Sequence, residues 1–233
     1  MTRRLSLSVP GTSGNDSSRL DRPVRLLAVS DEADRAFDFE SNRQQVRPLD
    51  AILGCGDLEP DYLSFLADAF HVPLLYVLGN HDRGANWESA DPHLPGRLDG
   101  RVEQIAGVNI AGLSWPGTVR GRPARDDVAA WRQVLGLAFK SAARRRPLII
   151  LSHVPPSGLG DTPEDPFHRG FVAYRWLLRW LSPIAWLHGH TALAGSADWR
   201  TEWRDTTLAN VTGAVLIEIG DPQRAGTIAA VKA

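Results

Sequence analysis

Several short apolar runs in this sequence end in a polar side chain that could hold a metal ion. The polar residues at these ends are Asp31, Asp57, Asn80 with His81 and Asp82, His153, and His188 with His190. In open α/β sheets, ligands bind beyond the carboxyl ends of the strands, so residues far apart in sequence can converge there. Carboxylate, amide and imidazole groups together form a mixed oxygen and nitrogen set that suits a divalent metal such as manganese, iron or zinc.

Each of these residues also has an ordinary structural explanation. A single aspartate after a strand most often caps a helix or forms a turn, and a single histidine is commonly part of the core or the surface. The recurrence of such residues at the same end of successive strands favours one shared site over several unrelated ones.

The apolar runs have the length and composition of buried strands. The segments between them have apolar residues at the spacing of a helix. Runs rich in Val, Ile and Leu predict strands that are buried on both faces. Helices are predicted over 61–70, 126–146 and 170–181, and in the last of these Trp176 and Trp180 are expected to pack in the core. This alternation predicts an α/β fold with a largely parallel sheet. Residues 206–233 instead resemble two or three consecutive strands with a turn at 220–226, which adds antiparallel pairing.

Composition limits the domain organisation and the partners. A chain of 233 residues with 43% hydrophobic content supports one sizeable core. We predict a disordered tail over 1–22 and a single domain over 23–233. The net charge of −1 argues against long nucleic acid or an anionic membrane as a partner. A single cysteine, Cys55, within an apolar run and no apolar stretch long enough to span a bilayer favour a cytoplasmic protein.

Four short motifs occur in an order that resembles a known family. They are "GD" at Gly56–Asp57, "GNHD" at Gly79–Asp82, "SHVPP" at Ser152–Pro156 and "GHT" at Gly189–Thr191. In order and approximate spacing they resemble the calcineurin-like metallophosphoesterases, from about Arg25 onward. The resemblance implies a four-layer αββα sandwich with mixed parallel and antiparallel sheets, around a dinuclear metal centre that hydrolyses phosphoric esters.

The resemblance also implies a role for each matching residue. Asp57 would bridge the two metals, and the second metal would be completed by Asn80, His153 and His190. His81 would lie near the leaving group as a general acid or electrostatic stabiliser, oriented by Asp82.

The half of the site that would hold the first metal departs from the family pattern. The family motif DxH reads Asp31–Glu32–Ala33 here, and GHxH reads Gly189–His190–Thr191–Ala192. Both missing histidines belong to the first metal, so Asp31 is expected to be its surviving ligand, beside Asp57. Two carboxylates and water suit a weaker, hard-cation site. The alternatives are that Glu32, Asp34 or His188 substitutes as a ligand, or that the position is empty.

These observations predict a metal-dependent hydrolase of phosphoric mono- or diesters with one tight metal site and one altered site. The alternative is a degenerate homologue that binds metal or nucleotide as a regulatory module. The long loops at 83–107 and 155–170 are expected to select a phosphate ester substrate. For Arg83, Trp87, His168 and Arg169 in these loops, an ordinary solvated-loop role is favoured over substrate contact. The oligomeric state is not indicated.

Overall fold

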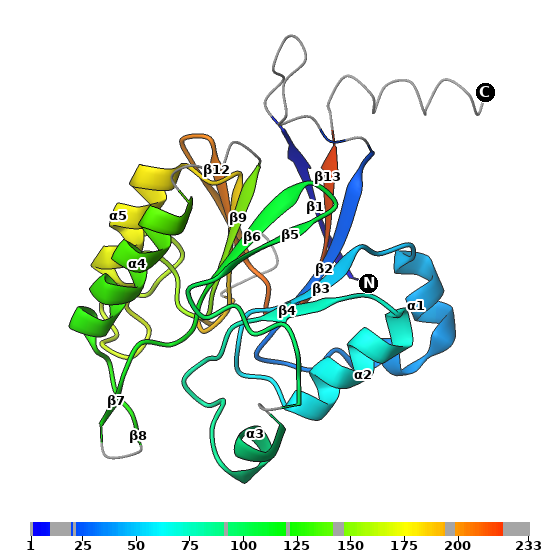
Figure 1. Cartoon of the computed structure of the whole chain (residues 1–233), viewed down its shortest axis with the longest axis horizontal. Helices are drawn as coiled ribbons and strands as arrows, with labels where there is room; N and C mark the ends of the chain where they lie inside the picture. The colour runs from blue at the N-terminus through cyan, green and yellow to red at the C-terminus, as the bar shows by residue number, and fades with distance from the viewer. Residues whose placement is uncertain are drawn as a thin grey trace.

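The structure is a computed structural model of the whole chain. It describes residues 2–9, 20, 22–90, 93–119, 122–141, 147–193 and 199–220. Two β-sheets pack face to face in it, and helices cover the outer face of each sheet (Figure 1). The predicted four-layer αββα sandwich with mixed sheets is therefore confirmed.

The first sheet has five strands in the order β1-β13-β2-β3-β4. Their bounds are β1 Arg3–Ser8, β2 Val24–Ser30, β3 Ala51–Gly54, β4 Leu74–Tyr76 and β13 Gly213–Gly220. Strands β2, β3 and β4 are parallel, whereas β13 is antiparallel to β2 and parallel to β1. The three parallel strands therefore end at one edge of the sheet.

The second sheet has six strands in the order β11-β12-β10-β9-β6-β5. Their bounds are β5 Val102–Ile105, β6 Val108–Leu113, β9 Leu148–Ser152, β10 Ala185–His188, β11 Arg200–Trp203 and β12 Thr206–Asn210. Strands β6, β9, β10 and β12 are parallel. The short strands β7 (Thr118–Val119) and β8 (Arg122–Pro123) form a separate hairpin.

Helices form the two outer layers. The 3-10 helix η1 (Arg35–Asp38), α1 (Glu40–Val46), α2 (Pro60–Phe70) and α3 (Ala85–Ala90) lie on the side of the first sheet, and α4 (Asp127–Ser141) and α5 (Val172–Leu181) cover the second. One apolar cluster fills the space between the sheets, and one lies under each helical layer. Cys55 is fully buried between the sheets, as expected. No helix in the described part of the chain is long and apolar enough to cross a membrane.

The prediction of a disordered tail over 1–22 is wrong for its first part. Residues 3–8 form β1, an edge strand that buries Leu5 and Leu7 against the first sheet. Apolar side chains alternate with polar ones along β1, which is the pattern of a strand with one buried face. The strand β1 is stable only because β13, more than 200 residues later in the sequence, supplies its hydrogen-bonding partner.

Two further expectations need correction. The consecutive strands β12 and β13 belong to different sheets, and the predicted turn at 220–226 lies largely outside the described residues. Trp180 does not pack in the core, because its side chain is 63% exposed on the outer face of α5. The three predicted helices form as α2, α4 and α5, and their starts differ from the predicted ones by one or two residues. Residues 142–146 of the second predicted helix lie outside the described residues.

Candidate metal centre

The sharp turns that follow the parallel strands position the candidate ligands. Asp31 follows β2, Asp57 follows β3 and His190 follows β10, and all three have positive φ angles of 60°, 55° and 67°. This left-handed conformation is uncommon for residues other than glycine and costs of order 1 kcal/mol or more at each position. At these three positions the strained turn lets the side chain leave the strand direction and point between the two sheets.

Glycines in the motifs allow the turns to approach each other closely. A Cβ on Gly79 would lie 2.1 Å from Asp57 Oδ1, and one on Gly189 would lie 2.0 Å from Asp31 Oδ2. A Cβ on Gly56 would lie 2.8 Å from His153 Nδ1. The glycine in each motif therefore makes room for a candidate metal ligand that belongs to a different turn.

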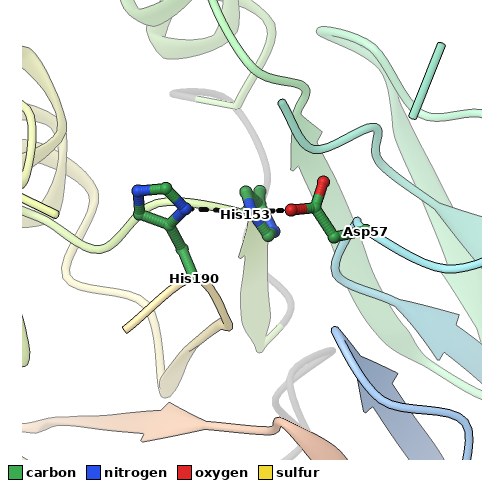
Figure 2. A group of neighbouring side chains, drawn as sticks. All are labelled: Asp57, His153 and His190. Carbon is green, nitrogen blue, oxygen red and sulfur yellow. Dashed lines mark hydrogen bonds and ion pairs between the residues drawn. The ribbon is translucent and has the colours of Figure 1, made fainter. Parts of the chain in front are cut away.

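Asp57, His153 and His190 form a compact cluster (Figure 2). His153 lies in the middle: its Nε2 is 3.1 Å from Asp57 Oδ2 and 3.2 Å from His190 Nδ1. One possible ligand atom from each of the three residues lies within 4.8 Å of the others. This nitrogen and oxygen set matches what a divalent transition metal binds.

Backbone carbonyl groups fix which ring nitrogen of each histidine faces the cluster. His153 Nδ1–H donates to the Cys55 carbonyl at 2.9 Å, so Nε2 faces Asp57. His190 Nε2–H donates to the Phe167 carbonyl at 2.8 Å, so Nδ1 faces His153. A hydrogen bond from the distal nitrogen is the usual way in which proteins orient a metal-binding imidazole.

The cluster is electrostatically coupled. Burial by itself would lower the pKa of His153, but the hydrogen bond and the charge of Asp57 raise it above its ordinary value. Burial acts to raise the pKa of Asp57, but His153 lowers it. Burial and the nearby His153 lower the pKa of His190 to about 4. Asp57 and His153 therefore favour the charged form of each other.

Asn80 supplies the clearest independent sign of a ligand site. Its Oδ1 is buried and has no hydrogen-bond partner in the described part of the chain. An unsatisfied buried oxygen costs roughly 1–3 kcal/mol, so it needs an explanation. A metal ion bound by Asp57, Asn80, His153 and His190 would satisfy this oxygen, so the residues present fit the group.

Asp82 does not orient His81, which corrects the expectation for this pair. Both Asp82 carboxylate oxygens are instead held by backbone N–H groups: Asp57 and Gly79 donate at 2.7 Å and Leu58 at 3.1 Å. Burial raises the pKa of Asp82 to about 6, aided by the charge of Asp57. Asp82 therefore ties the turn that carries Asp57 to the turn that carries Asn80. His81 is exposed, and its backbone N–H donates to Asp57 Oδ1 at 2.8 Å.

Asp31 lies beside the cluster but is not one of its three members. Its carboxylate accepts hydrogen bonds from the backbone N–H of His190 at 3.1 Å and from Thr212 Oγ1 at 3.2 Å. Its role as a metal ligand remains a prediction.

The three suggested substitutes for the missing first-metal ligands are not part of the cluster either. Glu32 is exposed, and Asp34 accepts a hydrogen bond from Ala36 N–H as the N-cap of η1. His188 is buried, with its Nε2 directed at Gly160.

A cavity of about 450 Å³ opens beside the cluster on the side of the first sheet. Asp31, Asp57 and Asp82 line it together with Arg83, and Ala33 lines it at the position of a missing histidine. Arg83 donates to the Gly117 carbonyl at 2.9 Å and has no ion-pair partner among the residues described. Trp87 is buried against Tyr76 and so is a core residue, which corrects the solvated-loop role expected for it.

Two residues near the cluster were missed by sequence reasoning. The ring of Trp115 lies 5.7 Å from that of His190, and its buried Nε1–H has no partner in the described chain. Phe167 acts through its backbone carbonyl, which no residue type reveals. His168, which follows it, lies 5.0 Å from the His190 ring and pairs with Asp165. For Trp115, the only sign in the sequence that it could lie near the site was its position directly after an apolar run.

The sandwich and the cluster of Asp57, His153 and His190 define a candidate divalent-metal centre between two sheets. The family model of the calcineurin-like phosphoesterases matches residues 24–193. The chain therefore belongs to this family of metal-dependent phosphoesterases. No curated protein sequence matches the chain.

Solved structures share the fold at low sequence identity. One has 16% identity and a TM-score of 0.58, over 84% of this chain and 95% of the other. A dimetal phosphatase from Danio rerio has 12% identity and a TM-score of 0.53, over 83% of this chain and 88% of the other.

Proposed function

We propose that this protein hydrolyses a phosphoric mono- or diester with one tightly bound divalent metal ion, manganese, iron or zinc. Asp57, Asn80, His153 and His190 would hold this ion. The observation that carries the proposal is the buried Oδ1 of Asn80, which has no partner in the described chain. Asn80 belongs to the turn whose His81 N–H donates to Asp57, and the two imidazoles of the cluster are already oriented. A bound cation would neutralise charge on the phosphate oxygens and lower the pKa of a coordinated water.

The surrounding residues supply the remaining parts of a hydrolytic site. His81 is exposed at the cavity wall, where its imidazole can hold the proton that a leaving oxygen needs. The Arg83 guanidinium lines the same cavity without an ion-pair partner in the described chain, so it can bind a phosphate oxygen. Asp82 is a positioning residue, because its carboxylate acts only on the backbone of the ligand-bearing turns.

We also propose that the first-metal position is altered in this chain. Ala33 lines the cavity where the family pattern would place a histidine, and Asp31 faces the backbone of His190. Two carboxylates leave room for a weakly held, hydrated magnesium or manganese ion. Replacing both Ala33 and Ala192 by histidine is expected to raise the tightly bound metal toward two ions per chain. An unchanged metal content in the folded double variant would refute the altered site.

The test of function combines hydrolysis with metal content. Protein reloaded with manganese is assayed on p-nitrophenyl phosphate and on bis-p-nitrophenyl phosphate, beside an Asn80→Ala variant. Loss of the Asn80 oxygen is expected to lower both bound metal and hydrolysis, the latter by about a hundredfold. Asn42→Ala removes a half-buried asparagine on α1, away from the site, whose side chain donates to the Ala36 carbonyl; it is the matched control and should keep both.

Each alternative result has a definite meaning. Hydrolysis that survives in Asn80→Ala would place catalysis elsewhere and refute the site. Folded wild-type protein that binds metal but hydrolyses neither ester would favour the degenerate binding module.

A further inference from the structure

The helical layer over the second sheet exposes an unusual amount of apolar surface. Five of the eight large apolar side chains that are exposed in the described part of the chain lie on α4 and α5. The two most exposed of these five are Phe139 at 86% and Trp180 at 63%; the others are Val128, Leu135 and Val172. The two helices lie side by side at the outside of the molecule (Figure 1). Single exposed apolar residues are common, but a contiguous group marks an interaction surface.

The spacing of these residues places them on one continuous face. On α4, Leu135 and Phe139 are seven and eleven residues after Val128, and on α5 Trp176 and Trp180 are four and eight after Val172. Trp131 of α4 and Trp176 of α5 join the two helices, with ring centroids 5.8 Å apart, and Trp180 stacks on Trp176 at 5.6 Å. We call this surface, formed by the exposed side of both helices, the α4–α5 face.

The charges on the α4–α5 face have one sign. Arg132 follows Val128 by four residues and Arg179 follows Trp176 by three, so both share the face, and both are exposed. Neither arginine forms an ion pair with another described residue. The single acidic residue of the two helices is Asp127, and it is already paired with Arg125 at 3.0 Å.

This combination selects one class of partner. Exposed tryptophan and phenylalanine beside arginine, with no available carboxylate, is the composition of a helical face that lies in the interface of an anionic bilayer. A second copy of the same face would bring like charges together without carboxylates to pair them. We propose that the α4–α5 face binds the surface of an anionic lipid bilayer. The net charge of −1 led to the opposite expectation because it averages over all faces of the molecule.

Vesicle co-sedimentation tests this proposal on the full chain. The protein is expected to sediment with vesicles of phosphatidylcholine mixed with phosphatidylglycerol, less with phosphatidylcholine alone, and less as salt increases. The double variant Phe139→Ser/Trp180→Ser should bind about tenfold more weakly or worse, because both side chains would leave the interface. Arg132→Glu/Arg179→Glu should also lose binding.

Two control variants test whether the loss of vesicle binding is specific to substitutions on the α4–α5 face. Phe39→Ser removes an exposed phenylalanine, 64% accessible, from the opposite helical layer. Arg4→Glu reverses one exposed charge on β1. Both should bind vesicles like the wild type. Arg144, Arg145 and Arg146 lie outside the described residues and remain unchanged in every variant, so any attraction they add is common to all. Circular dichroism melts verify that each variant is folded.

A second measurement reports the position of the face directly. Bromine-labelled lipids should quench the fluorescence of Trp180 in the wild type, and this part of the quenching should disappear in Trp180→Phe. Wild-type protein that does not sediment with anionic vesicles would overturn the proposal. So would vesicle binding that both face variants retain, or a dimer in sedimentation velocity that Phe139→Ser/Trp180→Ser dissolves, since the face would then bind a second copy.

Discussion

A single methyl group at Gly79 should dismantle the metal centre without removing any of its chemical groups. The Cβ of an alanine at this position would lie 2.1 Å from Asp57 Oδ1, 2.8 Å from Asp57 Cγ and 2.8 Å from the Asp57 backbone nitrogen. Two of these contacts involve the carboxylate, which can move only by giving up its place in the cluster. The third involves backbone that the Asp82 carboxylate holds in place.

The size of the effect follows from these distances. Carbon and oxygen atoms in contact need more than 3 Å, so Asp57 Oδ1 must move by roughly 1 Å. Metal–ligand distances tolerate only about 0.2 Å, so this displacement exceeds the tolerance several-fold. We expect the affinity for manganese to fall by about a hundredfold and the free energy of unfolding to fall by about 1–3 kcal/mol from the overpacking.

Isothermal titration with manganese and urea denaturation of Gly79→Ala measure the two quantities. Gly136→Ala is the matched control, because a Cβ there would meet nothing within 4 Å in the middle of α4. That control should keep its metal affinity and gain up to about 1 kcal/mol of stability from the better helix former. Metal affinity in Gly79→Ala equal to that of the wild type would refute the close packing of these turns.

Three further outcomes are expected. Manganese binding should release protons, and more of them at lower pH, because Asp57 raises the pKa of His153 and a histidine must lose its proton before it binds the ion; calorimetry in buffers of different ionisation enthalpy measures the release. Burial lowers the pKa of His188 from 6.5 to about 4, so its contribution to stability is complete above about pH 6.5 and is lost as the pH falls toward 4. Urea denaturation should show about 2 kcal/mol of this loss between pH 7 and 5, absent in His188→Gln. Leu5→Ala should cost about 2–4 kcal/mol by the same assay, whereas a free tail would cost nothing.

Much of the candidate site could be predicted, because the Asp and His residue types themselves indicate metal binding. Asp57, His153 and His190 follow apolar runs directly, and parallel strands bring such positions to one edge. To predict that these residues converge, it is enough to recognise that the strands before them are parallel. Asp82 was misassigned because its neighbour in the motif is His81, whereas its actual partners are backbone amides from two turns, which carry no sequence signal.

The errors in the fold have a common physical origin. Strand β1 was missed because its partner is about 210 residues away, and a short alternating segment has no stability without such a partner. Trp180 was placed in the core because apolar spacing shows that residues share a helical face but not which face is covered. Both errors concern contacts between elements, which local pattern does not contain.

The place of β13 between β1 and β2 sets an order of events during synthesis of the protein. The first sheet joins β1 and β2 only through β13, whose residues leave the ribosome about two hundred positions after those of β1. Until then β1 has no neighbour, and Asp31 lacks the hydroxyl of Thr212. The nascent chain must therefore keep β1 unpaired until β13 has been synthesised, and this sheet and the Asp31 side of the site can be completed only then.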